Sequence, residues 1–217
     1  MAHFYKLICS FALCLYLTQS ASAQQFLINM DLAQGDHLKA YGIAFHALEQ
    51  GFTVEWLLNY RGGSFVIPAT EELVRLARLR GVGFKPIGGA ELSQIYAEIE
   101  GDNMERIMLE KPPKIAVYTP PENRPWDDAV TMALDYAEVP YDKLWDEEVL
   151  EGKLEDYDWL HLHHEDFTGQ YSKFYSYHRM PWYQQQQASS ESMAKRLGYP
   201  TVSEEKKAVA RTIRSYV

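Results

Sequence analysis

Short apolar runs alternate with longer amphipathic stretches from Phe26 onward. The apolar runs predict strands near 26–30, 53–58, 83–87, 114–119 and 157–163. The amphipathic stretches, in which apolar residues recur at helical spacing, predict helices near 36–50, 70–80, 89–100, 126–138, 184–197 and 203–216. Because strands and helices alternate along the chain, we expect an α/β fold with a layered, mostly parallel sheet flanked by helices.

The best candidate for an internal boundary is the segment 110–114, Glu-Lys-Pro-Pro-Lys. Its two prolines end the preceding element before the next apolar run begins. The segment separates either two sub-lobes, 24–110 and 114–217, or only two turns of one sheet. We therefore expect one α/β domain over 24–217, with these sub-lobes as its internal division.

The first 23 residues have the pattern of a secretory signal peptide. Lys6 precedes an apolar run that ends at Leu17, and Ala21-Ser22-Ala23 forms a small-x-small cleavage site. The apolar run is too short to cross a bilayer, and no later run is long enough. We expect a secreted or periplasmic protein without a membrane span, whose mature chain begins near Gln24.

Export processing would remove both cysteines, Cys9 and Cys14. The mature chain would then have no thiol for a disulfide, a metal or a nucleophile, so its fold must rest on a hydrophobic core. The full chain has a formal charge of −9, and loss of Lys6 with the signal makes the mature chain more acidic by one unit. This acidic balance argues against nucleic acid and anionic membranes as partners.

Most of the histidines that remain after processing lie between 161 and 178. The predicted strand 157–163 leads into His164, Glu165 and Asp166, which would stand in the loop at its carboxyl end. Ligands bind at that edge in open α/β sheets, because the loops that leave parallel strands converge there. We take His163, His164 and Glu165 as candidate catalytic residues with acid/base or supporting roles.

The same segment holds the best candidate metal ligands, His161, His163 and Glu165, since imidazole and carboxylate groups suit zinc, iron or manganese. No His-Glu-x-x-His pair and no cysteine ligand completes the set. Polar loop residues that bond to the backbone around a strand end explain the pattern more simply. We therefore expect no metal and no other cofactor.

Two further polar segments follow predicted strands and would reach the same sheet edge. The candidate ligand-binding residues in them are Asp31, Asp36, His37, Arg61, Gly62 and Gly63. The paired glycines would let backbone amides approach an anion or an oxyanion. The alternatives are that Asp36 caps the helix that follows it and that the glycines form a tight turn between two strands.

The segment 167–183 is dense in aromatic residues. They are Phe167, Tyr171, Phe174, Tyr175, Tyr177, Trp182 and Tyr183. Aromatic faces of this density stack on sugars or line a cleft, and core packing beneath a long loop explains them equally well. Because buried Tyr and Trp need a hydrogen-bond partner, a partly wet cleft wall reconciles the two interpretations.

The C-terminal helix carries Val209, Ile213 and Val217 on one face and ends without a glycine or a polar tail. Such an end is typical of a chain that continues into a further element. An uncovered apolar helix face would also favour self-association. We therefore expect a C-terminally truncated chain that associates with itself through this helix.

Four segments of the chain resemble a known family. They are Asp-His-Leu-Lys-Ala-Tyr-Gly-Ile-Ala at 36–44, Val-Glu-Trp-Leu-Leu-Asn-Tyr-Arg-Gly-Gly-Ser-Phe at 54–65, Pro-Trp-Asp-Asp-Ala-Val-Thr at 125–131 and Trp-Leu-His-Leu-His-His-Glu-Asp-Phe-Thr-Gly-Gln-Tyr at 159–171. The chain is similar in these segments to an exported family of Bacteroidetes that commonly carries the name asparagine synthetase B. The resemblance implies a class I glutamine amidotransferase-like, flavodoxin-like layout, of which this chain is the N-terminal part.

The resemblance implies amide-hydrolysing chemistry, with a nucleophile encoded beyond Val217. It does not imply amidation of aspartate, because the chain lacks both an N-terminal cysteine and a Ser-Gly-Gly-x-x-Ser loop for ATP. The competing hypothesis is a non-catalytic periplasmic module that binds a small ligand or a sugar. The two hypotheses share a small-molecule partner.

Overall fold

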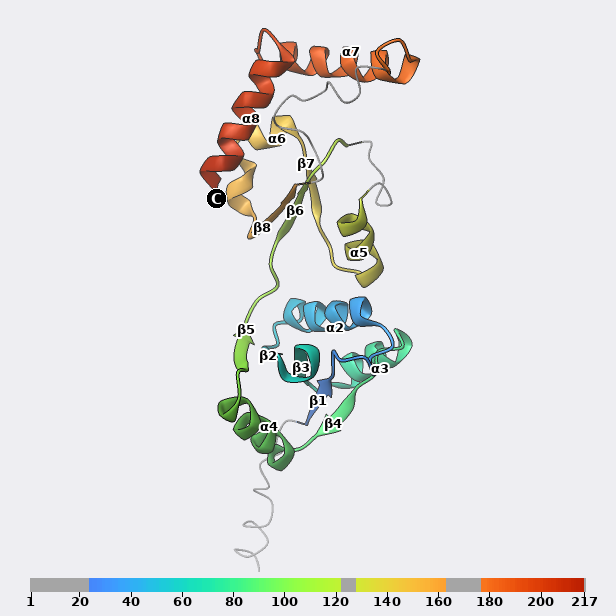
Figure 1. Ribbon diagram of the computed structural model, residues 1–217, viewed down its shortest axis with the longest axis vertical. Coiled ribbons are helices and arrows are strands. Elements are labelled where there is room, and N and C mark those ends of the chain that lie inside the picture. Colours follow the sequence, from blue (N-terminus) through green and yellow to red (C-terminus); the bar gives the residue numbers. More distant parts are fainter. Residues whose placement is uncertain (1–23, 122–127, 163–176, 217) are drawn as a thin grey trace, which may run out of the picture. The chain divides into compact units, whose positions relative to one another are not determined.

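The computed structural model of the protein describes residues 24–121, 128–162 and 177–216 (Figure 1). Signal-like residues 1–23 and the candidate residues His163, His164 and Glu165 lie outside this part of the chain. The chain divides into two compact units, with the boundary between Lys111 and Pro112.

The first unit is built on a five-stranded sheet. Its strands are β1 (Gln25–Ile28), β2 (Val54–Leu58), β3 (Ser64–Pro68), β4 (Lys85–Ile87) and β5 (Glu105–Leu109). Their order in the sheet is β4-β1-β3-β2-β5, and every pair of neighbours is antiparallel. Because β3 lies between β1 and β2 and runs against both, those two strands point the same way and end at the same edge.

Helices cover both faces of this sheet. They are α2 (His37–Glu49), α3 (Glu71–Leu79) and α4 (Gly89–Gly101), with the single turn η1 (Tyr60–Gly62) between β2 and β3. Side chains alternate between the faces of a strand. In β1, Phe26 and Ile28 therefore join the core beneath α2 and α3, whereas Leu27 joins the core beneath α4.

The second unit contains a small parallel sheet. Its strands β6 (Ile115–Tyr118), β7 (Asp142–Leu144) and β8 (Trp159–Leu162) lie in the order β7-β6-β8, and both pairings are parallel. The helical elements are α5 (Ala129–Ala137), α6 (Asp146–Leu150), η3 (Lys153–Asp156), α7 (Pro181–Arg196) and α8 (Val202–Tyr216). The core lies between the sheet and the elements α6, η3 and α8.

The expectation of one layered, mostly parallel sheet is wrong. The larger sheet is antiparallel throughout, and only the three-stranded sheet of the second unit is parallel. The error arises from β3 and β5, which the sequence pattern did not predict as strands. With β3 present, β2 and β3 form a hairpin, and a hairpin makes neighbouring strands antiparallel.

The apolar face of the C-terminal helix is covered, contrary to the prediction from its sequence. Val209 and Ile213 are buried in the core of the second unit, where α8 packs beside α6 and the β6 strand. Val217 lies outside the described residues. The uncovered face that suggested self-association is therefore covered within the unit itself.

Candidate functional site

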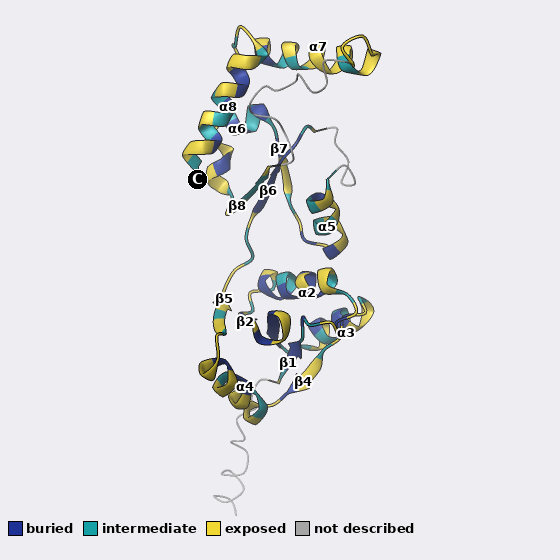
Figure 2. Ribbon diagram, in the orientation of Figure 1, coloured by how far each residue is buried: buried dark blue, intermediate teal, exposed yellow. Residues whose placement is uncertain are grey.

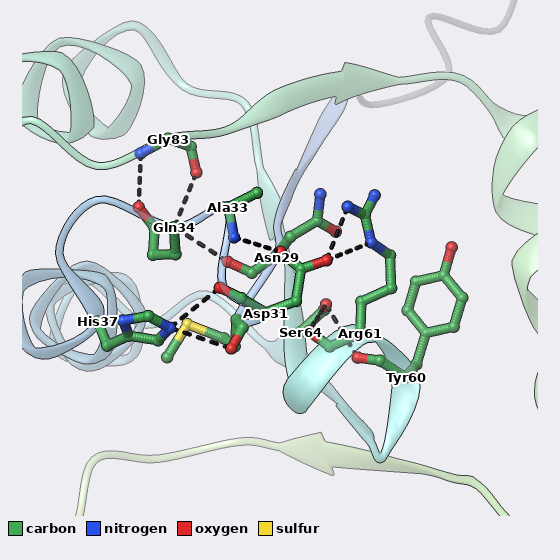
Figure 3. Close-up of polar contacts among 10 residues, drawn as sticks. Asn29, Asp31, Ala33, Gln34, His37, Tyr60, Arg61, Ser64 and Gly83 are labelled. Atoms are coloured by element: carbon green, nitrogen blue, oxygen red, sulfur yellow. Dashed lines mark hydrogen bonds and ion pairs between the residues drawn. The ribbon is translucent and has the colours of Figure 1, made fainter.

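The structure brings together three of the residues that the sequence singled out in the first unit, Asp31, His37 and Arg61 (Figure 3). Asp31 follows β1 and Arg61 follows β2, so both stand at the edge where these two strands end. The Nε and Nη2 atoms of Arg61 each lie 2.7 Å from Oδ2 of Asp31. A hydrogen bond from the backbone N–H of Ala33, assisted by Arg61, lowers the pKa of Asp31 below its usual value.

His37 and Asp36 are tied to the backbone around the same turn. Nε2 of His37 lies 3.1 Å from the carbonyl oxygens of both Met30 and Asp31, which both accept a hydrogen bond when Nε2 carries the proton. Asp36 is the N-cap of α2, and its carboxylate accepts a hydrogen bond of 2.9 Å from the backbone N–H of Lys39. The capping alternative for Asp36 is thus confirmed.

The glycine pair closes a tight connection between β2 and β3. Gly62 and Gly63 have φ angles of 83° and 95°, and Arg61 itself has a φ of 46°, in the left-handed region that glycine tolerates best. A Cβ atom at Gly62 would lie 2.3 Å from the carbonyl oxygen of Met30. The backbone of Met30 donates a hydrogen bond of 3.1 Å to the carbonyl of Arg61, which fixes this connection against the end of β1.

Gln34 completes the arrangement and was missed by the sequence interpretation. Its side chain is buried, donates to the carbonyls of Asn29 and Gly83 at 3.0 and 3.1 Å, and accepts from the backbone N–H of Gly83 at 2.9 Å. The contacts in this group, which we call the Asp31 cluster (Asp31, Gln34, His37 and Arg61), run mainly to one another and to nearby backbone. Its ligand-binding role stays a prediction.

The second unit contains a buried group of charged side chains that the sequence did not indicate. We call it the buried charge cluster; its members are Tyr118, Asp146, Glu205 and Lys206, and all four are buried. Nζ of Lys206 lies 2.9 and 2.8 Å from the two carboxylate oxygens of Asp146, and 3.0 Å from the hydroxyl oxygen of Tyr118. The Tyr118 hydroxyl in turn donates to Asp146.

Parallel strand ends assemble this cluster. Tyr118 is the last residue of β6 and pairs with Leu144, the last residue of β7. The chain then turns into α6, whose first residue is Asp146, at an N-terminus that favours negative charge. Lys206 reaches the same carboxyl edge from α8 and also lies 3.9 Å from the centre of the Trp145 ring.

Glu205 adds a second carboxyl group to the same interior. The side chain is only 1 % exposed, and its Oε1 atom has no hydrogen-bond partner among the described residues. Burial, and then the neighbouring Asp146, raises the pKa of Glu205 to about 7, although Lys206 acts in the opposite direction. The group therefore exchanges a proton close to neutral pH.

A pocket of about 500 Å³ lies against this cluster, between the strand ends and the helices α7 and α8. Its described lining comprises Pro120, Trp145, Tyr183, Gln186, Gln187, Ser190, Glu191, Ala194, Lys195, Pro200, Thr201, Val202, Ser203 and Lys206. The volume falls in the range of about 300–1,000 Å³ that is usual for small-ligand pockets. We call it the α7 pocket.

The α7 pocket has an unusual wall. The lining residues of α7 from Tyr183 to Ala194 recur at steps of three and four and so form one face of the helix. On that face only Ala194 is buried in the protein core, and α7 is exposed over most of its length (Figure 2). A helix normally turns an apolar face toward its domain, whereas α7 turns amide, hydroxyl and carboxylate groups toward a cavity.

His161 is the one candidate metal ligand that the structure describes. Its Nε2 atom lies 3.3 Å from Oδ1 of Asp128, the N-cap of α5. Burial raises the pKa of Asp128, but hydrogen bonds from the backbone of Thr131 and Val130, and then from His161, outweigh it, so the pKa is lowered overall. Within 24–121, 128–162 and 177–216, no three His, Cys, Asp or Glu side chains are placed to hold a metal ion.

Sequence reasoning missed the buried charge cluster for an identifiable reason. Glu205 has the negative charge expected in the first turn of any helix, and Lys206 is the first of the basic residues that ordinarily follow it. Asp146 follows a strand of three residues, β7, that the pattern did not reveal. Lys206 and Tyr118 are 88 residues apart in the sequence, so no local spacing relates them.

Comparison with protein-family models, with curated proteins and with solved structures gives no match to this chain. In the part of the chain that the structure describes, no helix is both long enough and apolar enough to cross a membrane.

Proposed function

We propose that this chain is a ligand-binding module and that the α7 pocket is the place where a small polar molecule binds. The observation that carries the proposal is the polar face of α7, which lines a cavity of ligand size instead of packing into a core. Trp145 and Lys206 line the same cavity. Export of the protein, expected from residues 1–23, forms part of the proposal, because a binding module of this kind would meet its ligand outside the cytoplasm.

The buried charge cluster supports the proposal by holding one wall of the pocket in place. Lys206 lines the pocket, but its ammonium group is already engaged by both oxygens of Asp146 and by Tyr118. Its role is thus to position the side chains around it. On α7, Gln187 donates to Glu191 and Ser190 donates to the backbone carbonyl of Gln186, and the side-chain oxygens of both residues can still accept a hydrogen bond from a ligand. Few precisely placed polar groups beside aromatic surface are the usual composition of such sites.

The run of glutamines on α7 offers a matched test. Gln186 and Gln187 line the pocket, whereas the neighbouring Gln185 does not. The purified chain is screened by calorimetric titration against maltotriose, L-glutamine and succinate, which represent neutral, zwitterionic and anionic ligands. We expect one of them to bind, Gln187→Leu to weaken that binding by about two- to tenfold through a lost hydrogen bond, and Gln185→Leu to leave it unchanged.

A pocket-filling variant gives the opposing test. Ser190 lies on the pocket face of α7, so Ser190→Trp should fill the cavity and abolish binding while leaving the helical content measured by circular dichroism unchanged. A ligand that binds equally well to wild type, Gln187→Leu and Ser190→Trp would bind elsewhere, and the proposal would be wrong.

Amide hydrolysis, the chemistry that the family resemblance implies, stays a prediction, as do the catalytic roles of His163, His164 and Glu165. Residues 24–217 contain no cysteine. We expect the purified chain to release no ammonia from glutamine or asparagine above the uncatalysed background, because it lacks a thiolate to attack the amide carbonyl. Ammonia release that a single substitution in 24–217 eliminates would contradict this expectation.

A further inference from the structure

We propose that the ligand of the α7 pocket is a neutral oligosaccharide, and that Trp182 and Tyr183 form the outer surface on which it stacks. This inference rests on the proposed function, because it assigns a chemical class to the ligand of that same pocket. Three features carry it: a group of partly exposed aromatic rings that includes the lining residue Tyr183, a lining without net charge, and a row of amide and hydroxyl groups along α7.

The aromatic group lies at the start of α7. The Trp182 ring is 5.8 Å from the ring of Tyr177 and 5.8 Å from that of Tyr183, and Tyr183 itself lines the pocket. Trp182 remains 47 % exposed despite these contacts. A sugar ring has a flat C–H face that packs on an aromatic ring while its hydroxyls stay hydrated, so a saccharide would cover this apolar surface without a dry cavity.

The charges in the described lining cancel. Lys206 is neutralised by Asp146, with which it forms a buried ion pair. Glu191 and Lys195 carry opposite charges one turn apart on α7, and Glu191 also accepts a hydrogen bond of 3.2 Å from the side chain of Gln187. A pocket built for a phosphate or a carboxylate would present unpaired cationic donors, whereas this lining suits an uncharged ligand.

The middle of the wall is suited to hydroxyl groups. Gln186, Gln187 and Ser190 lie along the pocket face, and amide and hydroxyl side chains both donate and accept hydrogen bonds. A sugar hydroxyl also does both, so the two sets complement each other. From Tyr183 to Ala194 this face is about 16 Å long at the rise of an α-helix, which is longer than one sugar ring and matches a short oligosaccharide lying along α7.

The test uses the purified full chain and four neutral probes: maltotriose, cellotriose, xylotriose and mannotriose. Binding is followed by saturation-transfer NMR, which identifies the ligand protons that touch the protein, and by calorimetric titration. We expect at least one probe to bind with saturation at its C–H protons. Trp182→Ala should weaken that binding by about two- to tenfold, in keeping with the loss of one aromatic stacking partner.

Trp159→Ala is the matched control. Trp159 is 42 % exposed, lies on β8 and does not line the pocket, so its removal should leave saccharide affinity unchanged. Gln187→Leu alters a residue of the pocket lining, and its loss of binding does not depend on the folding of the aromatic group.

The possible outcomes separate this inference from the proposed function. If L-glutamine or succinate binds in a manner sensitive to Gln187→Leu while none of the trisaccharides binds, the pocket is a binding site and the saccharide inference is wrong. If a trisaccharide binds equally well to Trp182→Ala and to wild type, the stacking surface is wrong. If no probe and no compound of the first screen binds, both the inference and the proposed function fail.

Discussion

Each unit of this protein joins an acidic residue beyond the end of a strand to a basic residue from another element, but the two pairs have different surroundings. In the first unit, Asp31 and Arg61 meet at the rim of the sheet, where the Arg61 side chain is 46 % exposed. In the second unit, Asp146 and Lys206 meet in the interior, with Asp146 only 3 % exposed. An exposed ion pair contributes little to the free energy of unfolding. In a buried ion pair, the cost of removing both charges from water offsets most of their attraction, but removal of one partner is strongly destabilising because the other charge stays buried and unpaired.

The difference follows from the two sheets. The five-stranded sheet of the first unit has an apolar core on each face, so the charged side chains of this unit can stay at the edge of the sheet. The parallel sheet of the second unit has three strands, all ending at one edge, and the elements that follow them bring Tyr118, Asp146 and Lys206 together there. The α7 pocket opens beside that edge, which is where parallel sheets usually place their ligands.

The largest expected effect of a single substitution is that of Asp146→Ala. It would leave Lys206 charged and buried without its partner, and such a change costs about 3–5 kcal/mol of the free energy of unfolding. Urea denaturation followed by circular dichroism measures this loss. Glu151→Ala, which removes an exposed carboxylate of the same unit that pairs with Lys153, should change little. Equal effects of the two substitutions would contradict the contrast between buried and exposed pairs.

The second-largest expected effect is a pH dependence of the free energy of unfolding that arises from Glu205. Its pKa is raised from 4.5 to about 7 in the folded protein, so between these values the folded state holds a proton that the unfolded state has released. The free energy of unfolding should therefore fall as pH rises from about 4.5 to about 7, by on the order of 3 kcal/mol from this group. The measurement is the free energy of unfolding of wild type and of Glu205→Gln at several pH values in this range. The difference between the two proteins removes the contribution of other titrating groups.

The opposite result is equally easy to recognise. If the wild type and Glu205→Gln have parallel stability profiles from pH 4.5 to 7, Glu205 has an ordinary pKa in the folded protein, and its carboxyl group is more hydrated than its exposure of 1 % indicates.

In the first unit, the most sensitive position should be Gly62. Gly62→Ala combines a φ of 83° with a Cβ only 2.3 Å from the carbonyl oxygen of Met30, so the connection must move away from β1. We expect a loss of about 2 kcal/mol or more. Gly51 is a matched control, since its φ is 80° but a Cβ there meets no atom within 4 Å; Gly51→Ala should cost about 1 kcal/mol. Equal losses of stability at the two positions would show that the positive φ angle alone, and not the close approach to Met30, sets the cost of these substitutions.

The smallest effect is expected from Arg61→Ala. The pair with Asp31 is exposed, and the Asp31 carboxylate keeps its hydrogen bond from the backbone of Ala33 when Arg61 is removed. The urea transition should stay within experimental error of wild type, as is usual for surface pairs. A loss of stability as large as that of Asp146→Ala would show that the exposed pair of Arg61 and Asp31 stabilises the first unit far more than surface pairs usually do.

Local features of the fold could be predicted from the sequence because their causes are local. The helices α2, α3, α4 and α8 lie within about two residues of their predicted ranges, since periodicity and N-capping residues define them, as Asp36 does for α2. The β5 strand was missed because it is largely exposed and its apolar run, Ile107 to Leu109, is short, and β3 was missed because it follows the glycine pair so closely. Pairing direction was then assigned from an incomplete set of strands.

The candidate sites divide in the same way. The Asp31 cluster was partly predictable, because its residues follow two recognised strands and only the strand between them was missing. The buried charge cluster and the α7 pocket were not, because they join residues of β6, α6 and α8 that no spacing connects.

The sequence by itself determined most helical segments, most strands, the acidic charge, the absence of cysteine after residue 23, and the tight connection at Gly62 and Gly63, because each depends on neighbours within a few residues. Only the tertiary structure decided that the larger sheet is antiparallel, that Val209 and Ile213 are covered, and that Asp146 and Lys206 share a buried site. These outcomes depend on contacts between distant segments. An apolar run records that a strand is buried, but not which strand lies beside it or in which direction that neighbour runs.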